Sequence, residues 1–468
     1  MSHTTVWRSI STGRHARRWP ARSPLLAIPL LGAVLAAGGC AIYHPLPLPQ
    51  GPQLAASLPA TAQRPLDMTE VATLAVLNNP DLNAARAQLG VAQAQAFAAG
   101  ILPNPQFNFS SDRPIDRVNA PADPRYPEYH AYGFGLSIDL RALLTQHSRH
   151  AAAQAAWRQA REELLWREWQ TVAEARLLYV AQALAAQRRA LLSPAAAAFT
   201  RAAARSQRAL AEGNIARDQA DTDQAILLTV RDQAATAART ANQSARALRA
   251  LLGLAPTVRI PLAPLTAPPI PTRAAVAAAA GRLPQQRPDL RALRAGYHSQ
   301  EERVRIAVLS QFPNVVIGVN RARDFSDVHS LGDTVSFDLP LFDRGQGEIA
   351  IQRATRAQLR AEYLARLDQA TADVWQLWSD MRRLHAQLAD LDQRVPRLAR
   401  TVGAARRAYR AGNYPAAGYF GLVGAYLGAA TNRIDVLQSL WSDSIALATL
   451  TGTPVEPAVV AGHEANPT

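Results

Sequence analysis

The feature that most constrains the fold of this chain is an internal duplication. The stretch RALAEGN at Arg208 to Asn214 returns as RAYRAGN at Arg407 to Asn413, and the two glycines are 199 residues apart. The earlier pair LSIDL and VSFDL, which end at Leu140 and Leu339, has the same offset of 199 residues. Similarity at such a fixed distance indicates one structural unit that is present twice.

The composition excludes several classes of protein. A hydrophobic content of 48% is too high for a wholly disordered chain, whereas an aromatic content of only 6% and abundant alanine favour closely packed helices. The net charge of +14 comes from arginines that alternate with Glu, Asp and Gln, which is typical of solvated helix faces and argues against nucleic-acid binding. The chain has no lysine, so it cannot hold a Walker A loop or a Schiff base. Its histidines are scattered and it has one cysteine, so we expect no catalytic residue, no metal site and no cofactor.

The N-terminus has the pattern of an export signal. Several arginines precede an apolar run from Leu25 to Ala37, which is too short to span a membrane comfortably and is followed by AAGGC. This ending resembles a bacterial lipoprotein cleavage site, which implies that Cys40 is acylated, and Ala41 in place of an aspartate favours the outer membrane. An inner-membrane anchor and a plain signal with an incidental cysteine are the alternatives.

Residues with a two-residue period predict four strands. Tyr132, Phe134, Leu136 and Ile138 alternate with small or polar residues, and the second half repeats this pattern twice. We expect strands at about 105–114, 129–140, 313–322 and 333–342. Strands of this length could cross an outer membrane, but four cannot close a barrel, so several chains would have to share one. A small soluble sheet is the alternative.

The longest segments predict two helical hairpins. Between Gly347 and Gly403, and just beyond, apolar residues recur at alternating steps of four and three from Tyr363 to Tyr409, which indicates a supercoiled seam. At ~1.5 Å per residue, a helix of this length reaches roughly 100 Å. Each rod ends at Gly-Asn, residue types that stop a helix, and is followed by a shorter helical stretch.

These patterns together give a domain plan. The fold class is mainly α with a small membrane β part, built from two strand-strand-hairpin units. The segments are a signal peptide at 1–39, an acylated Pro-rich leader at 40–67, a first repeat at 68–253 with its tip near 213, a Pro-rich linker at 254–274, a second repeat at 275–452 with its tip near 412, and a loose tail at 453–468.

The chain resembles the TolC family of outer membrane efflux proteins. The resemblance rests on RPDLRALRA (Arg287 to Ala295), LPLFDRGQGEIA (Leu339 to Ala350), the duplicated layout and the cysteine after the signal, and it covers residues 68 to 452. The segment from Asn79 to Phe107 resembles the heavy-metal-efflux branch in particular. The resemblance implies a homotrimer in which twelve strands form one outer-membrane barrel, continued by a helical tunnel whose tips meet a periplasmic adaptor and an inner-membrane pump.

The two tips supply the candidate functional residues. We expect Arg208, Gly213, Asn214, Arg407, Gly412 and Asn413 to lie at the hairpin tips and to contact the adaptor. Asp218 and Asp221 follow the first turn and fit either an acidic ring at a tunnel mouth or simple stabilisation of the helix dipole. Tyr414, Tyr419 and Phe420 follow the second turn and could form an apolar constriction, or the glycines among them could permit close helix packing.

The predicted function is therefore an outer-membrane exit channel in a tripartite efflux system, with outer membrane lipid around it and no enzymatic activity. The alternative is an exported coiled-coil scaffold that spaces the layers of the cell envelope without conducting anything. The four lipid-length strands favour the channel, because a scaffold has no need of them. The sequence does not name the cargo.

Overall fold

The computed structural model describes residues 42–58, 64–113 and 130–452. The signal peptide, Cys40 and the C-terminal tail expected from the sequence lie outside these residues. The chain divides into two units; in the first, Met1–Gln53, residues 42–53 have no helix or strand, and the second is Leu54–Thr468. In sequence order the second unit contains α2 (Met68–Asn78), α3 (Pro80–Gly100), β1 (Gln106–Asp112), β2 (Ala131–Asp139), α4 (Leu140–Ala211), α5 (Arg217–Leu251), α6 (Arg273–Gln286), α7 (Pro288–Leu309), β3 (Val315–Arg323), β4 (His329–Phe337), α8 (Gln346–Arg410) and α9 (Ala416–Thr451).

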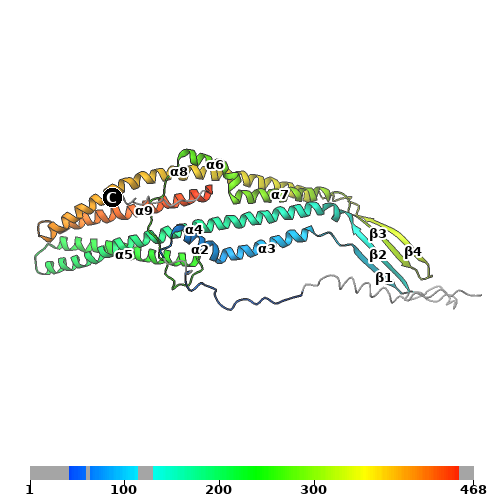
Figure 1. The fold of residues 1–468 in the computed structure, drawn as a ribbon, viewed down its shortest axis with the longest axis horizontal. Helices are drawn as coiled ribbons and strands as arrows, with labels where there is room; N and C mark the ends of the chain where they lie inside the picture. Colours follow the sequence, from blue (N-terminus) through cyan, green and yellow to red (C-terminus); the bar gives the residue numbers. More distant parts are fainter. Residues whose placement is uncertain (1–41, 59–63, 114–129, 453–468) are drawn as a thin grey trace, which may run out of the picture. The chain divides into compact units, whose positions relative to one another are not determined.

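The predicted fold class, two copies of a strand-strand-hairpin unit, is confirmed. α4 packs along α5, and α8 packs along α9, so each half ends in an antiparallel helical hairpin (Figure 1). The shorter helices α3 and α7 both pack on the strand-proximal part of α4. Every residue of the predicted seam between Tyr363 and Tyr409 is buried or half-buried, with Val374 and Met381 almost completely enclosed.

The four strands form one open antiparallel sheet in the order β1-β2-β3-β4. The duplicated strands β2 and β3 lie side by side at its centre, with Leu136 opposite Val319, while β1 and β4 are the edges. The last strand was expected near 333–342 but lies at His329–Phe337. It begins early because Asp324 accepts hydrogen bonds from the backbone of Ser326 and Val328 and closes a tight turn. It ends before Pro340, which has no N–H to continue the ladder.

The two faces of the sheet differ in chemistry. One face carries nine large apolar side chains that are all exposed in the single chain, and the opposite face carries small and polar residues. The exposed apolar side chains on this face are Phe107, Phe109, Phe134, Leu136, Ile317, Val319, Leu331, Val335 and Phe337, and the register places Arg321 and Asp333 on the same face. On the small face, a Cβ at Gly318 would lie 2.8 Å from the carbonyl oxygen of Leu136, so only glycine fits there. Within the described residues no helix covers the apolar face.

The sequence Pro-Asp-Leu occurs at Pro80 and again at Pro288, and in both places it starts a helix. Asn79 caps α3 by accepting a hydrogen bond of 2.9 Å from the N–H of Leu82, and Pro80 occupies the first turn. At the corresponding place before α7, Arg287 forms a buried ion pair with Asp289, with nitrogen–oxygen distances of 2.8 and 2.5 Å. The Arg287 guanidinium also lies 5.1 Å from the ring of Trp166 on α4. The same position thus caps a helix in one half and fixes it to α4 in the other.

The end of the leader is paired with the linker between the halves. Ala55 and Leu66 form parallel bridges with Leu254 and Leu262. The hydroxyl of Tyr179 on α4 lies 2.8 Å from the carbonyl oxygen of Ala263 and 3.3 Å from that of Leu66, which joins leader, linker and hairpin. Burial, aided by the nearby carboxylate of Asp67, raises the pKa of Tyr179 to about 12, so the hydroxyl keeps its proton.

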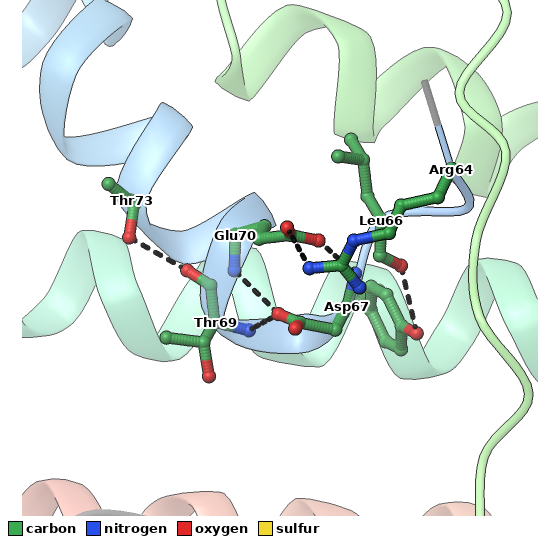
Figure 2. Close-up of polar contacts among 7 residues, drawn as sticks. Arg64, Leu66, Asp67, Thr69, Glu70 and Thr73 are labelled. Carbon is green, nitrogen blue, oxygen red and sulfur yellow. Dashed lines mark hydrogen bonds and ion pairs between the residues drawn. The ribbon is translucent and has the colours of Figure 1, made fainter. Parts of the chain in front are cut away.

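A capping box then starts α2 directly after this pairing (Figure 2). The Asp67 carboxylate accepts hydrogen bonds from the N–H groups of Thr69 and Glu70, at 2.9 and 2.8 Å. The Glu70 carboxylate in turn accepts from the N–H of Asp67 at 2.8 Å and pairs with Arg64 at 2.6 Å. These reciprocal bonds fix where the extended leader becomes helix.

Two single prolines lie inside the long helices. Pro194 in α4 and Pro396 in α8 each remove one backbone hydrogen bond, yet both helices continue past them because they are packed against neighbouring helices. In the described part of the chain, no helix is both long enough and apolar enough to cross a membrane.

Candidate functional site at the hairpin tips

The two repeated Gly-Asn turns have the same backbone geometry. Gly213 and Gly412 adopt left-handed φ angles of 74° and 78°. The N–H of Asn214 donates to the carbonyl oxygen of Ala209 at 2.7 Å, and that of Asn413 donates to Ala408 at 2.9 Å. The glycine N–H groups donate to carbonyl oxygens three residues back, at 3.0 and 3.1 Å. This pair of bonds is the Schellman motif, which satisfies the last carbonyl groups of a helix and explains why glycine recurs.

The two tip arginines are exposed and take part in the turns mainly through their backbone. The carbonyl oxygen of Arg208 accepts from the N–H of Glu212 at 3.0 Å, and that of Arg407 accepts from Ala411 at 3.1 Å. The Arg208 side chain also donates from Nε to the carbonyl oxygen of Ala204 at 3.3 Å. Both guanidinium groups remain accessible at the end of the hairpins.

The acidic residues after the first turn separate into two kinds. Asp218 and Asp221 are exposed; Asp221 lies 3.6 Å from Arg217, which is 86% exposed, so this ion pair contributes little stability. Asp223, which the sequence groups with them, is buried at 3% exposure and accepts a short hydrogen bond from the hydroxyl of Ser206 on α4. Its position on the apolar face of α5, three residues after Ala220 and four before Leu227, could have separated it from the other two.

After the second turn, the structure separates Phe420 from the other aromatic residues. Tyr414 and Tyr419 are half-buried at the surface. A Cβ at Gly418 would lie 3.0 Å from the ring of Tyr414, so the glycine makes room for this ring at the start of α9. The three glycines that follow are not crowded in the single chain, because a Cβ at any of them would have no neighbouring atom within 4 Å; they are Gly421, Gly424 and Gly428.

The expectation that Phe420 faces an aperture needs correction. Its side chain is only 5% exposed and lies in a cluster that joins the two hairpins. The ring centroid is 5.0 Å from that of Phe199 on α4 and 5.3 and 5.9 Å from those of Tyr419 and Tyr409. In sequence, Phe420 stands beside Tyr419 and shares its glycine-rich surroundings, but a one-residue step rotates a side chain by about 100° around a helix. Phe420 therefore packs the hairpins together rather than lining an opening.

Outside the tips, the described residues form no cluster of metal-binding side chains. Within residues 42–58, 64–113 and 130–452, no group of three or more His, Cys, Asp or Glu side chains is arranged to hold a metal ion. The side chain of His150 lies 3.0 Å from that of Gln154 and packs against Gly100.

Comparisons with known proteins agree with this architecture. The sequence profile of the family described as outer membrane efflux protein matches residues 71–254 and 280–453. No curated protein sequence matches the chain. Among solved structures, the CmeC outer membrane channel of Campylobacter jejuni is 15% identical, with 84% of this chain and 86% of that chain covered and a TM-score of 0.69. The outer membrane protein VceC of Vibrio cholerae is 17% identical, with 83% and 97% covered and a TM-score of 0.66. The open state of the MtrE outer membrane channel of Neisseria gonorrhoeae is 14% identical, with 83% and 90% covered and a TM-score of 0.66.

Proposed function

The chain belongs to the family of outer membrane efflux proteins, and from this premise we propose that it is the outer-membrane exit channel of a tripartite efflux system. It is a transport channel rather than an enzyme. Cargo reaches it from an inner-membrane pump through a periplasmic adaptor and leaves by passive conduction. The pump supplies the energy, so the channel itself needs no catalytic group.

The observation that carries this proposal is the open sheet. Within the described residues β1 and β4 each leave one edge unpaired, and one face carries nine exposed apolar side chains. Unpaired strand edges are not tolerated in hydrocarbon, whereas an apolar outer face with a small, polar inner face is what a membrane barrel requires. A sheet of this kind is stable in a membrane only when its two edges are paired.

A homotrimer would pair the two open edges of the sheet by symmetry. If β1 of each copy pairs with β4 of the next, four strands from each of three copies close one twelve-stranded barrel. The apolar face then contacts outer membrane lipid, and the small face, with Gly318 and its neighbours, lines the lumen. The same ring brings three pairs of helical hairpins into one tunnel below the barrel.

The long helices give the tunnel its reach. α4 has 72 residues and α8 has 65, so each spans roughly 100 Å at ~1.5 Å per residue. The tips therefore lie deep in the periplasm, where Arg208 and Arg407 with the two Gly-Asn turns contact the adaptor. The exposed guanidinium groups offer hydrogen-bond donors at the end of each hairpin.

The tips also contain the resting aperture. Asp218 and Asp221 are exposed at the start of α5 and would form an acidic ring when repeated by three-fold symmetry, which favours cations. Tyr414 and Tyr419 are the apolar candidates at the start of α9. Phe420 supports this aperture from behind, through its packing on Phe199.

The N-terminus anchors the channel a second time. We assign acylation to Cys40, which follows the export signal, and the Pro-rich leader carries the chain from there to its pairing with the linker at Ala55 and Leu66. A lipid chain on Cys40 would then be held in the outer membrane.

Conductance tests the channel against the scaffold. The full-length protein, extracted from outer membranes, should migrate as a heat-resistant trimer and give discrete single-channel currents in planar lipid bilayers. A scaffold without channel activity would insert no pore at any protein concentration. A monomer that stays soluble without detergent would contradict both the trimer and the barrel.

A further inference from the structure

A groove between the two hairpins has a composition that channel function alone does not explain. It encloses about 540 Å³ and is bounded by α4, α8 and α9. This volume is in the range of small-molecule sites, about 300–1,000 Å³. Four arginines from two different hairpins line it: Arg201 and Arg205 from α4, and Arg406 and Arg410 from α8.

No carboxylate of the described residues pairs with the four guanidinium groups. Within the described residues, none of the four makes an ion pair or a side-chain hydrogen bond. The sequence gives the reason, since residues 189–211 and 393–434 contain arginines but no Asp or Glu. Elsewhere the helices supply partners, as Asp392 does for Arg433 at 2.5 Å. Like charges that converge on one groove repel each other unless an anion lies between them.

The floor of the groove is aromatic. The rings of Tyr409 and Tyr419 are stacked, with centroids 5.1 Å apart and planes 10° from parallel. Phe420 lies beneath them, and apolar side chains such as Leu191 and Val423 complete the lining. Such a floor favours a flat apolar ligand, and arginine binds carboxylate, sulfonate or phosphate groups through paired hydrogen bonds.

From this arrangement we infer that the groove binds a planar aromatic anion, with its ring over Tyr409 and Tyr419 and its charge among the four arginines. The site goes beyond the proposed function, because binding to it requires neither an adaptor nor conduction. Since α4 belongs to the first hairpin and α8 to the second, a ligand in the groove contacts both and holds them together.

Calorimetric titration of the full-length protein in detergent with naphthalene-2-sulfonate tests this inference, with ligand-free micelles as the blank. We expect saturable binding of one ligand per chain that weakens as salt concentration rises. The neutral analogue 2-naphthol should bind at least tenfold more weakly. The double variant Arg205→Gln with Arg406→Gln should weaken sulfonate binding at least tenfold.

A matched pair of substitutions controls for net charge. Arg189→Gln with Arg400→Gln removes two exposed arginines from the same helices, neither of which lines the groove, and should leave the affinity within about twofold. Thermal unfolding of both double variants verifies that they are folded. Tyr419→Leu, which removes the aromatic face but keeps an apolar side chain, should also weaken binding.

Three results would overturn the assignment. The first is no saturable binding up to about 1 mM ligand at low salt, an affinity below any useful small-molecule site. The second is equal weakening in the two double variants, which would show a diffuse charge effect. The third is displacement of the sulfonate by a glutamate-rich helical peptide that binds more tightly, which would assign the groove to a protein partner instead.

Discussion

The burial of Phe420 gives the sharpest prediction about the tips, because a packing residue and a gate respond differently to truncation. Phe420→Ala removes a side chain that is 5% exposed and contacts three aromatic rings. Truncating a buried phenylalanine costs about 3–5 kcal/mol. At 1.4 kcal/mol per factor of ten, the equilibrium constant for packing of the tip helices falls by between about a hundredfold and a few thousandfold.

Hydrogen exchange followed by mass spectrometry measures this loss directly. We expect amide protection to fall by that factor in peptides from the tip ends of α4, α5, α8 and α9, and to stay unchanged in the helices beside the sheet. Phe420→Leu, which keeps most of the volume, should lose much less protection. Tyr414→Ala is the surface control, since its ring lies half-buried over Gly418.

The opposite pattern would refute the packing argument. If Phe420→Ala kept the protection of the unmodified protein while its single-channel conductance or open probability rose, the side chain would be acting as a gate. Conductance recorded on the same preparations therefore distinguishes the two roles. A change in conductance that appears only together with lost protection supports packing.

Three further substitutions test other parts of the structure. Tyr179→Phe leaves the carbonyl oxygen of Ala263 without the hydroxyl donor, whereas that of Leu66 still accepts from the N–H of Ala263. We expect a loss of about 1–3 kcal/mol in thermal stability and faster proteolysis of the leader. Burial, with a smaller effect from Asp380, raises the pKa of Asp443, so ionisation of Asp443 opposes folding above its usual pKa of 3.8. Asp443→Asn should therefore raise the melting temperature at pH 7. The difference from the unmodified protein should disappear as the pH falls toward 4. Gly412→Ala places a Cβ on a residue with a left-handed backbone and no neighbouring atom within 4 Å. Differential scanning calorimetry should therefore show that the free energy of unfolding falls by about 1 kcal/mol, and a fall above about 3 kcal/mol would contradict the absence of neighbouring atoms.

Features that depend on local periodicity or on the duplication could be predicted from the sequence. The seam from Tyr363 to Tyr409 and the Gly-Asn turns follow from the helix period and from the backbone preference of glycine. The two central strands follow from the alternation around Leu136 and Val319, but their pairing with each other does not. These predictions rest on local sequence patterns, so they need no information on which helices pack against each other.

Features that depend on which helix faces meet could not be predicted in the same way. Phe420 is buried because α4 of the first hairpin lies against it, and nothing near Phe420 in sequence indicates Phe199. The arginine-lined groove likewise combines Arg205 and Arg406, which are 201 positions apart. The parallel pairing of Leu66 with Leu262 has no strand pattern, because its bonds involve single residues of Pro-rich segments.

The shared barrel is the central claim, and disulfide cross-linking between sheet edges tests it most directly. Within one chain β2 and β3 separate β1 from β4, so the two edges lie about 14 Å apart, far beyond the ~7 Å that a disulfide allows between Cα atoms. A cysteine at Ser110 can be combined in turn with one at Ser330, Thr334 or Ser336, which lie on the same face. Single-cysteine variants control for Cys40, the only natural cysteine.

The shared barrel predicts that one of these combinations gives covalent dimers and trimers on mild oxidation in the outer membrane, and that reduction returns them to the monomer. The absence of cross-linked trimers at every register, in a protein that inserts into the outer membrane, would contradict closure of the barrel by β1 and β4 of neighbouring copies.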